Sequence, residues 1–114
     1  MASKLDEKVG KYIDDYKKKI DENDLDVDLM RKVTKSLVPA IYNRDAETVS
    51  AQKDEMDRIQ KNYLQKKLGL EGDDLMSSVE TVMERYGKSN RNKYRAVVYY
   101  LLCKHHGKES VYDS

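Results

Sequence analysis

The chain has 114 residues, of which 22 are Lys or Arg and 21 are Asp or Glu, so its formal net charge is +1. This length fits one domain, and 29 Leu, Ile, Val and Met side chains with nine Tyr supply enough apolar surface for a core, which excludes wholesale disorder. A single cysteine excludes a disulfide scaffold, and the longest apolar run, Ala96–Cys103, is far shorter than the ~20 residues of a membrane-spanning helix.

Apolar residues recur with helical spacing along the first third of the chain. Over residues 5–20 they follow steps of three and four, which predicts one amphipathic helix. A second helix is expected over 29–37, after an aspartate cap at Asp26 or Asp28. It ends before Pro39, because the residue that precedes a proline is disfavoured in the helical conformation.

Three further helices are expected in the rest of the chain. The third runs from an N-cap at Ser50 to Gly69, and the fourth spans 75–86. The fifth starts from a cap at Ser89 and contains AVVYYLLC, which is apolar almost all the way round, so we expect it to be the central helix. Since no segment alternates long enough to predict a strand, the expected fold is a single all-α domain of about five helices.

Residues 38–49 show no period, and a segment of this length without regular structure is often functional. It offers a compact polar set for a small ligand or a partner: Tyr42, Asn43, Arg44, Asp45 and Thr48. The alternative is structural, with apolar neighbours attaching the loop to the core while Asn43 and Asp45 form turns. We favour the structural interpretation.

The charges are distributed unevenly along the chain. Residues 85–108 carry seven basic side chains and no acid, whereas residues 1–84 have a net charge of −4. Within the basic segment, phosphate-type donors lie near the expected start of a helix, where free backbone N–H groups favour anions. These donors are Lys88, Asn90, Arg91, Asn92, Lys93 and Arg95. Alternatively, the basic groups pair with the acidic first and third helices.

The sequence contains few residues in the patterns that metal sites or catalytic sites require. Cys103 and His106 are three residues apart on one helical face, but a zinc site needs three or four ligands. We therefore expect Cys103 to be a buried thiol, and His105 and His106 to mark a helix C-terminus, where a protonated imidazole suits the helix dipole. The acidic run at 24–28 resembles a calcium loop without its glycine and its closing glutamate, so it is interpreted as a helix cap. No metal, cofactor or catalytic residue is predicted.

Three stretches together carry a resemblance to a known family: IYNRDAETVSA (41–51), NYLQKKLGL (62–70) and YGKSNRNKYRAVVYYLLCKHHGKESVY (86–112). With them the chain resembles a small bacterial family known only as a domain of unknown function, family 2853. The resemblance implies a bacterial, helical, stand-alone protein. It implies no activity, substrate or catalytic residue.

These observations favour one domain over residues 1–114, with frayed ends at 1–3 and 109–114. The charged start lacks the apolar stretch of a secretory signal, so we expect a cytoplasmic protein. The favoured function is a non-catalytic module that binds another protein or itself. The alternatives are a nucleic-acid or polyanion binder that uses 85–108, and an enzyme or small-molecule binder at the 42–48 loop.

Overall fold

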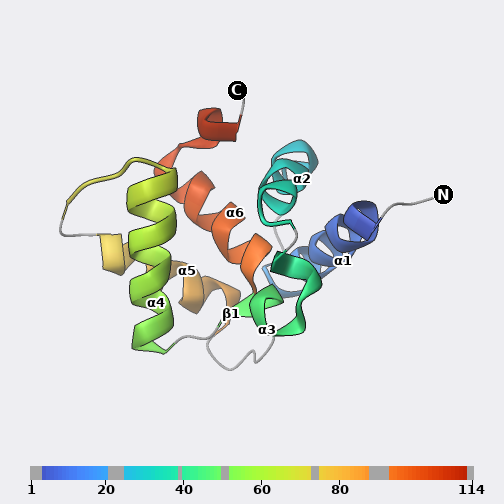
Figure 1. Cartoon of the computed structure of the whole chain (residues 1–114), viewed down its shortest axis with the longest axis horizontal. Coiled ribbons are helices and arrows are strands. Elements are labelled where there is room, and N and C mark those ends of the chain that lie inside the picture. The colour runs from blue at the N-terminus through green and yellow to red at the C-terminus, as the bar shows by residue number, and fades with distance from the viewer. Residues whose placement is uncertain are drawn as a thin grey trace.

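The computed structural model describes residues 4–20, 25–38, 40–49, 52–72, 75–87 and 93–112 (Figure 1). In chain order its elements are α1 (Lys4–Lys19), α2 (Val27–Ser36), η1 (Ala40–Tyr42), α3 (Arg44–Glu47), β1 (Thr48–Val49), α4 (Lys53–Ile59), η2 (Gln60–Lys67), α5 (Leu75–Tyr86), β2 (Lys93–Tyr94), α6 (Arg95–His106) and η3 (Glu109–Tyr112). Segments η1 and η3 are 3₁₀-helices, and η2 is a π-helix. The expected all-α domain of five principal helices is confirmed.

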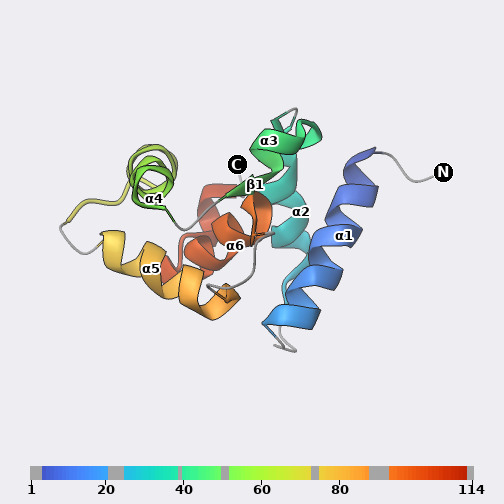
Figure 2. The same cartoon turned by 90° about the horizontal axis from the view of Figure 1, so that it is seen from below.

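Helix α6 forms the centre of the domain. It lies between α1 and α2 on one side and α4 and α5 on the other in both views (Figures 1 and 2). Every side chain of Ala96–Cys103 is buried, as its all-round apolar sequence predicts. The expected start at Ser89 is wrong, because α6 begins at Arg95 with Tyr94 as its N-cap, and Lys93–Tyr94 are extended as β2; Ser89 itself lies outside the described residues. Gly107 closes the helix in the left-handed conformation, with φ of 64°.

Helices α1 and α2 pack side by side through their apolar stripes. In α1 the buried residues are Val9, Tyr12 and Tyr16, spaced at the three- and four-residue steps of one helical face. In α2 the carboxylate of Asp26 accepts a hydrogen bond from the Leu29 backbone N–H at 3.1 Å. One of the two predicted caps, Asp26, is therefore the cap of α2.

The third expected helix is α4 continued by the eight-residue π-helix η2. Its N-cap is Gln52, which makes no side-chain cap hydrogen bond, so the prediction of Ser50 as the N-cap is wrong; Ser50 itself lies outside the described residues. Ile59 and Leu68 are both buried, although nine residues at about 100° each would place them about 180° apart on an α-helix. At roughly 82° per residue, for about 4.4 residues per π-helical turn, they fall on nearly the same face.

The aperiodic segment is more ordered than its sequence indicates. It contains η1, the single turn α3 and the strand β1, which pairs antiparallel with β2 in the register Thr48 opposite Tyr94 and Val49 opposite Lys93. Ile41 and Val49 are buried and hold the segment on the core. Elements of two to four residues are too short to establish a period, so the prediction of a loop without strands is corrected here.

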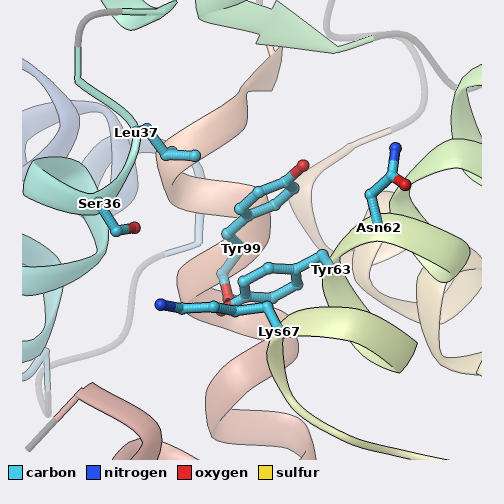
Figure 3. Close-up of a pocket in the computed structure, with 6 residues that line it drawn as sticks. All are labelled: Ser36, Leu37, Asn62, Tyr63, Lys67 and Tyr99. Carbon is cyan, nitrogen blue, oxygen red and sulfur yellow. Dashed lines mark hydrogen bonds between the residues drawn. The ribbon is translucent and has the colours of Figure 1, made fainter. Parts of the chain in front are cut away.

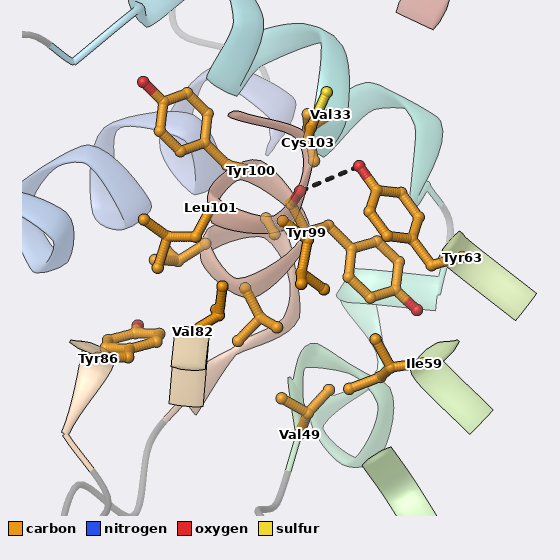
Figure 4. Packing of buried hydrophobic residues seen from close by; sticks show 14 of the residues in the cluster. Val33, Val49, Ile59, Tyr63, Val82, Tyr86, Tyr99, Tyr100, Leu101 and Cys103 are labelled. Atoms are coloured by element: carbon orange, nitrogen blue, oxygen red, sulfur yellow. Dashed lines mark hydrogen bonds between the residues drawn. The ribbon is translucent and has the colours of Figure 1, made fainter. Parts of the chain in front are cut away.

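All large aromatic residues of the core are tyrosines, because the chain has no Phe or Trp. The buried rings reach across elements with their hydroxyl groups (Figure 4). Tyr86 of α5 donates a hydrogen bond to Asp15 of α1, and the Tyr100 hydroxyl of α6 accepts one from the Asp26 backbone N–H at 2.8 Å. The core is thus joined by directional bonds as well as by apolar contact.

At the C-terminal end, Glu109–Tyr112 form η3, whereas residues 113 and 114 lie outside the described part of the chain. None of the described helices combines the length and the apolar character needed to cross a membrane.

Candidate functional site: a tyrosine-lined pocket

A pocket of about 180 Å³ opens between the end of α2, the π-helix η2 and the middle of α6 (Figure 3). We call it the tyrosine pocket. Its lining residues are Ser36, Leu37, Asn62, Tyr63, Lys67 and Tyr99. The π-helix brings three of these six residues to the pocket, and π-helical turns are frequent at functional sites.

The aromatic wall of the pocket is rigid. The rings of Tyr63 and Tyr99 are stacked, with centroids 4.0 Å apart and planes inclined by 16°. The Tyr63 hydroxyl donates to the backbone carbonyl of Tyr99 at 3.0 Å (Figure 4). Because that hydroxyl has one proton, the 2.8 Å hydrogen bond between Tyr63 and Tyr112 must be donated by Tyr112. The Tyr99 hydroxyl in turn accepts a hydrogen bond from Arg95 Nη1 at 3.1 Å.

The linked phenols of Tyr63 and Tyr112 are uncharged at neutral pH. Burial raises the pKa of Tyr63, and the neighbouring Tyr112 raises it further. Burial likewise raises the pKa of Tyr112 to about 12. Both phenols therefore stay protonated, and their protons are used in the chain of hydrogen bonds from Tyr112 through Tyr63 to Tyr99.

Among the described residues that line the pocket, Lys67 alone carries a charged group, its ammonium. Its Nζ lies 5.2 Å from the centroid of the Tyr112 ring, and its side chain is exposed. Within the described ranges, Lys67 forms no ion pair with an Asp or Glu. The pocket therefore combines mainly apolar walls with one positive charge that a bound acceptor can use.

The pocket has room for one small group. A protein cavity of ~150 Å³ accommodates benzene, and one water occupies ~30 Å³ in the liquid. A volume of about 180 Å³ thus fits a six-membered ring with one small substituent. Since sites for drug-sized ligands usually measure ~300–1,000 Å³, a large cofactor would not be enclosed here.

The predicted polyanion residues that the structure describes have roles inside the fold. Lys93 is 3% exposed, and burial lowers its pKa, helped by the nearby charge of Lys19. The Arg95 guanidinium donates to the Ala46 carbonyl at 2.8 Å and to Glu55 at 3.0 Å, in addition to Tyr99. The ion pair between Arg95 and Glu55 of α4 confirms, for this residue, the alternative in which basic groups pair with the acidic third helix. The remaining residues of the set lie outside the described residues: Lys88, Asn90, Arg91 and Asn92.

The polar set predicted in the 42–48 loop is divided among three short elements. Tyr42 is 40% exposed at the end of η1, Asn43 is exposed, and Thr48 is half-buried in β1. Arg44 and Asp45 belong to α3, but their side chains are not among those described.

Among the described side chains of this segment, Glu47 makes the most polar contacts, and the sequence analysis did not single it out. Its carboxylate, with 9% side-chain exposure, accepts hydrogen bonds from Lys8 at 2.6 Å, Tyr12 at 2.8 Å and Lys11 at 3.3 Å. Burial alone would raise the pKa of Glu47, but these three donors bring it below its usual value. Every donor comes from α1, so the cluster joins α1 to α3.

The cysteine and the histidines form no assembled catalytic or metal site in the described part of the chain. Cys103 is buried, and burial raises its pKa to about 11.

His106 of α6 hydrogen-bonds Ser78 of α5. The Ser78 hydroxyl donates its proton to the Leu75 carbonyl at 2.7 Å, so in the 2.8 Å hydrogen bond between Ser78 and His106 the donor is His106 Nε2. Burial, with His105, lowers the pKa of His106, so burial opposes the protonation that the helix dipole favours there. No three His, Cys, Asp or Glu side chains gather as metal ligands among the described residues.

A comparison with protein-family models matches residues 11–110 to the family described as protein of unknown function (DUF2853). The chain belongs to this family. The match confirms the resemblance drawn from the three sequence stretches, and it spans all six lining residues of the tyrosine pocket. None of the curated proteins searched matches the chain.

One sequence signal for the pocket exists in hindsight. The nine-residue separation of Ile59 and Leu68 within one apolar stripe is out of phase with an α-helix and in phase with a π-helix. No comparable local signal places Tyr63 against Tyr99, because their contact depends on how η2 packs on α6.

Proposed function

We propose that the protein is a small binding module without catalytic activity, and that it recognises a partner protein through the tyrosine pocket. The observation that carries this proposal is the lining itself: a rigid stacked wall of Tyr63 and Tyr99 beside the ammonium of Lys67. Such a site positions and discriminates a bound group through shape and one charge. Its described lining residues include no Asp, Glu, His or Cys that would serve as a general base or an activated nucleophile.

A partner protein is favoured over a free cofactor by the size of the pocket and by its surroundings. About 180 Å³ accommodates one large side chain, the usual anchor at the centre of a protein interface. Val38, which directly follows the lining residue Leu37, is a large apolar side chain that is 38% exposed. A partner that covers the pocket would also bury this residue.

The experiment is a selection of displayed random peptides on the immobilised protein, followed by affinity measurement on two variants. Ser36→Trp places a bulky ring at the mouth of the pocket, and Ser77→Trp adds the same ring at an exposed position of α5 outside the lining. We expect selected peptides to bind Ser77→Trp like the original protein and to lose at least tenfold in affinity for Ser36→Trp. Circular dichroism checks that both variants are folded.

Equal binding of the selected peptides to both variants would overturn the pocket as the recognition site. Failure to select any peptide with a dissociation constant below about 1 mM would overturn the peptide-binding function. If the protein dimerises in sedimentation experiments and Ser36→Trp abolishes the dimer, the partner is a second copy of the chain.

The alternative function is polyanion binding by residues 85–108, which carry seven basic side chains and no acid. Its support is weakened by the burial of Lys93 and the internal bonds of Arg95, so it depends on Lys88 and Arg91. Anisotropy of labelled random RNA and DNA at 50 and 200 mM salt tests it. Salt-sensitive micromolar binding that Lys88→Glu with Arg91→Glu removes would favour this alternative over the peptide-binding function.

A further inference from the structure

We infer that the tyrosine pocket takes an aromatic ring with a carboxylate a few bonds away, as presented by the C-terminal aromatic residue of a partner chain. This inference rests on the proposed function and adds to it the chemistry of the recognised group. It is carried by three features of the pocket: its aromatic wall, its single ammonium, which forms no ion pair with a described Asp or Glu, and its size.

The aromatic wall favours a ring over an aliphatic group. Tyr63 and Tyr99 form a stacked pair that hydrogen bonds to Arg95 and Tyr112 hold in place. A ring that enters the pocket packs against a surface that is already ordered, with Leu37 also in the lining. Aromatic pairs gain from offset and edge contacts beyond the area that they bury, so an aromatic anchor gains more here than an aliphatic one.

The charge of the lining favours a carboxylate on that ring. Lys67 is the one Lys, Arg, Asp or Glu among the described lining residues, and it forms no ion pair with an Asp or Glu of the described chain. Figure 3 shows the Lys67 side chain running past the Tyr63 ring, with its amine directed toward the α2 side, where Ser36 lies. The Tyr63 and Tyr112 protons are already donated within the protein, so neither phenol can donate to a bound anion, and Lys67 supplies the charged donor of the lining.

The size of the pocket favours the end of a chain over an internal residue. About 180 Å³ holds a ring and one small polar group, and the backbone of an internal residue would continue through the same space. An internal aromatic residue also places neutral peptide groups beside its ring, which would leave Lys67 without an anion. At a C-terminal Phe or Tyr, the ring and the α-carboxylate belong to one residue and both requirements are met.

The test compares two neutral ten-residue peptides of identical sequence that end in Phe, one with a free carboxylate and one with a terminal amide. Free 3-phenylpropionate serves as a third ligand. Binding is measured by calorimetry to the full chain, to Lys67→Gln and to the control Lys66→Gln, an exposed neighbour in η2 that does not line the pocket. Both lysines are exposed, so the fold should tolerate either change, which circular dichroism verifies.

We expect the acid peptide to bind the original protein at least tenfold more tightly than the amide. That preference should fall to within twofold in Lys67→Gln and persist in Lys66→Gln. Equal binding of acid and amide would overturn this inference and leave the proposed function standing. If 3-phenylpropionate binds as tightly as the acid peptide, the recognised group is a free aryl acid, and both the chain-end assignment and the protein-partner function are overturned.

Discussion

Replacing Glu47 by alanine should destabilise the fold by about 2–4 kcal/mol. The change leaves the buried Tyr12 hydroxyl without its acceptor, which costs about 1–3 kcal/mol. It also removes the ion pairs with Lys8 and Lys11. These side chains are 25% and 45% exposed, so water replaces much of each lost interaction and their joint contribution is about 1 kcal/mol. Typical domains have only ~5–15 kcal/mol of total stability.

A double-mutant cycle with Tyr12→Phe isolates the central hydrogen bond of this cluster. Urea unfolding followed by circular dichroism gives the free energy of unfolding of Glu47→Ala, Tyr12→Phe and the double variant. Once Glu47 is absent, Tyr12→Phe should be close to neutral, so a coupling of about 1–2 kcal/mol is expected. The exposed Glu80→Ala serves as a control and should stay within about 0.5 kcal/mol of the original protein.

A coupling below about 0.3 kcal/mol would refute this account, because it would mean that the two residues act independently.

The Glu47 cluster also makes the stability of the fold depend on pH, with a definite sign. The pKa of Glu47 in the folded protein lies below its usual value of 4.5. Its contribution to stability is therefore complete above about pH 4.5 and is lost as the pH falls through the folded-state pKa. Glu47→Gln should lose less stability over that acidic range than the original protein does.

Two further predictions concern the C-terminal half of α6. Because the folded-state pKa of His106 lies below its usual value of 6.5, the unfolded chain takes up the proton first, and the free energy of unfolding should decline as pH falls below about 6.5. This decline between pH 7.5 and 5.5 should be smaller in His106→Gln; an unchanged decline would show that other groups cause it. The buried Cys103, whose pKa burial raises to about 11, should react with a thiol reagent only on unfolding. Rapid reaction in native buffer would contradict its burial.

The parts of the fold that the sequence predicts best are those where burial follows a regular period. In α1, Val9, Tyr12 and Tyr16 lie on one face and are buried, and the apolar run Ala96–Cys103 becomes the centre of the core. These predictions depend only on local spacing, and the same spacing decides which face of a helix is buried. Helix starts are less predictable, since α6 begins after Tyr94, where pairing with β1 ends.

The candidate site was not predictable in the same way. The sequence-based candidates for a binding site were chosen for their charge and polarity. In the structure, however, Arg95 donates its hydrogen bonds to Ala46, Glu55 and Tyr99 within the fold. Three of the residues that form the pocket, Leu37, Tyr63 and Tyr99, belong to apolar stretches that the sequence pattern assigns to the core. Their role depends on contacts between η2, α2 and α6, which are distant in sequence, and no local pattern encodes such contacts.

The use of tyrosine as the sole large aromatic residue of this core has a consequence for how the chain folds. A hydrocarbon core tolerates slipped packings that bury the same area, whereas a slip here separates hydroxyls such as those of Tyr63 and Tyr86 from their partners. Each stranded hydroxyl costs about 1–3 kcal/mol, so a few of them together would cancel the stability of a misfolded compact state. The oxygen atoms of the core thus widen the energy gap between the native arrangement and its competitors, and they narrow the set of structures that this sequence can populate.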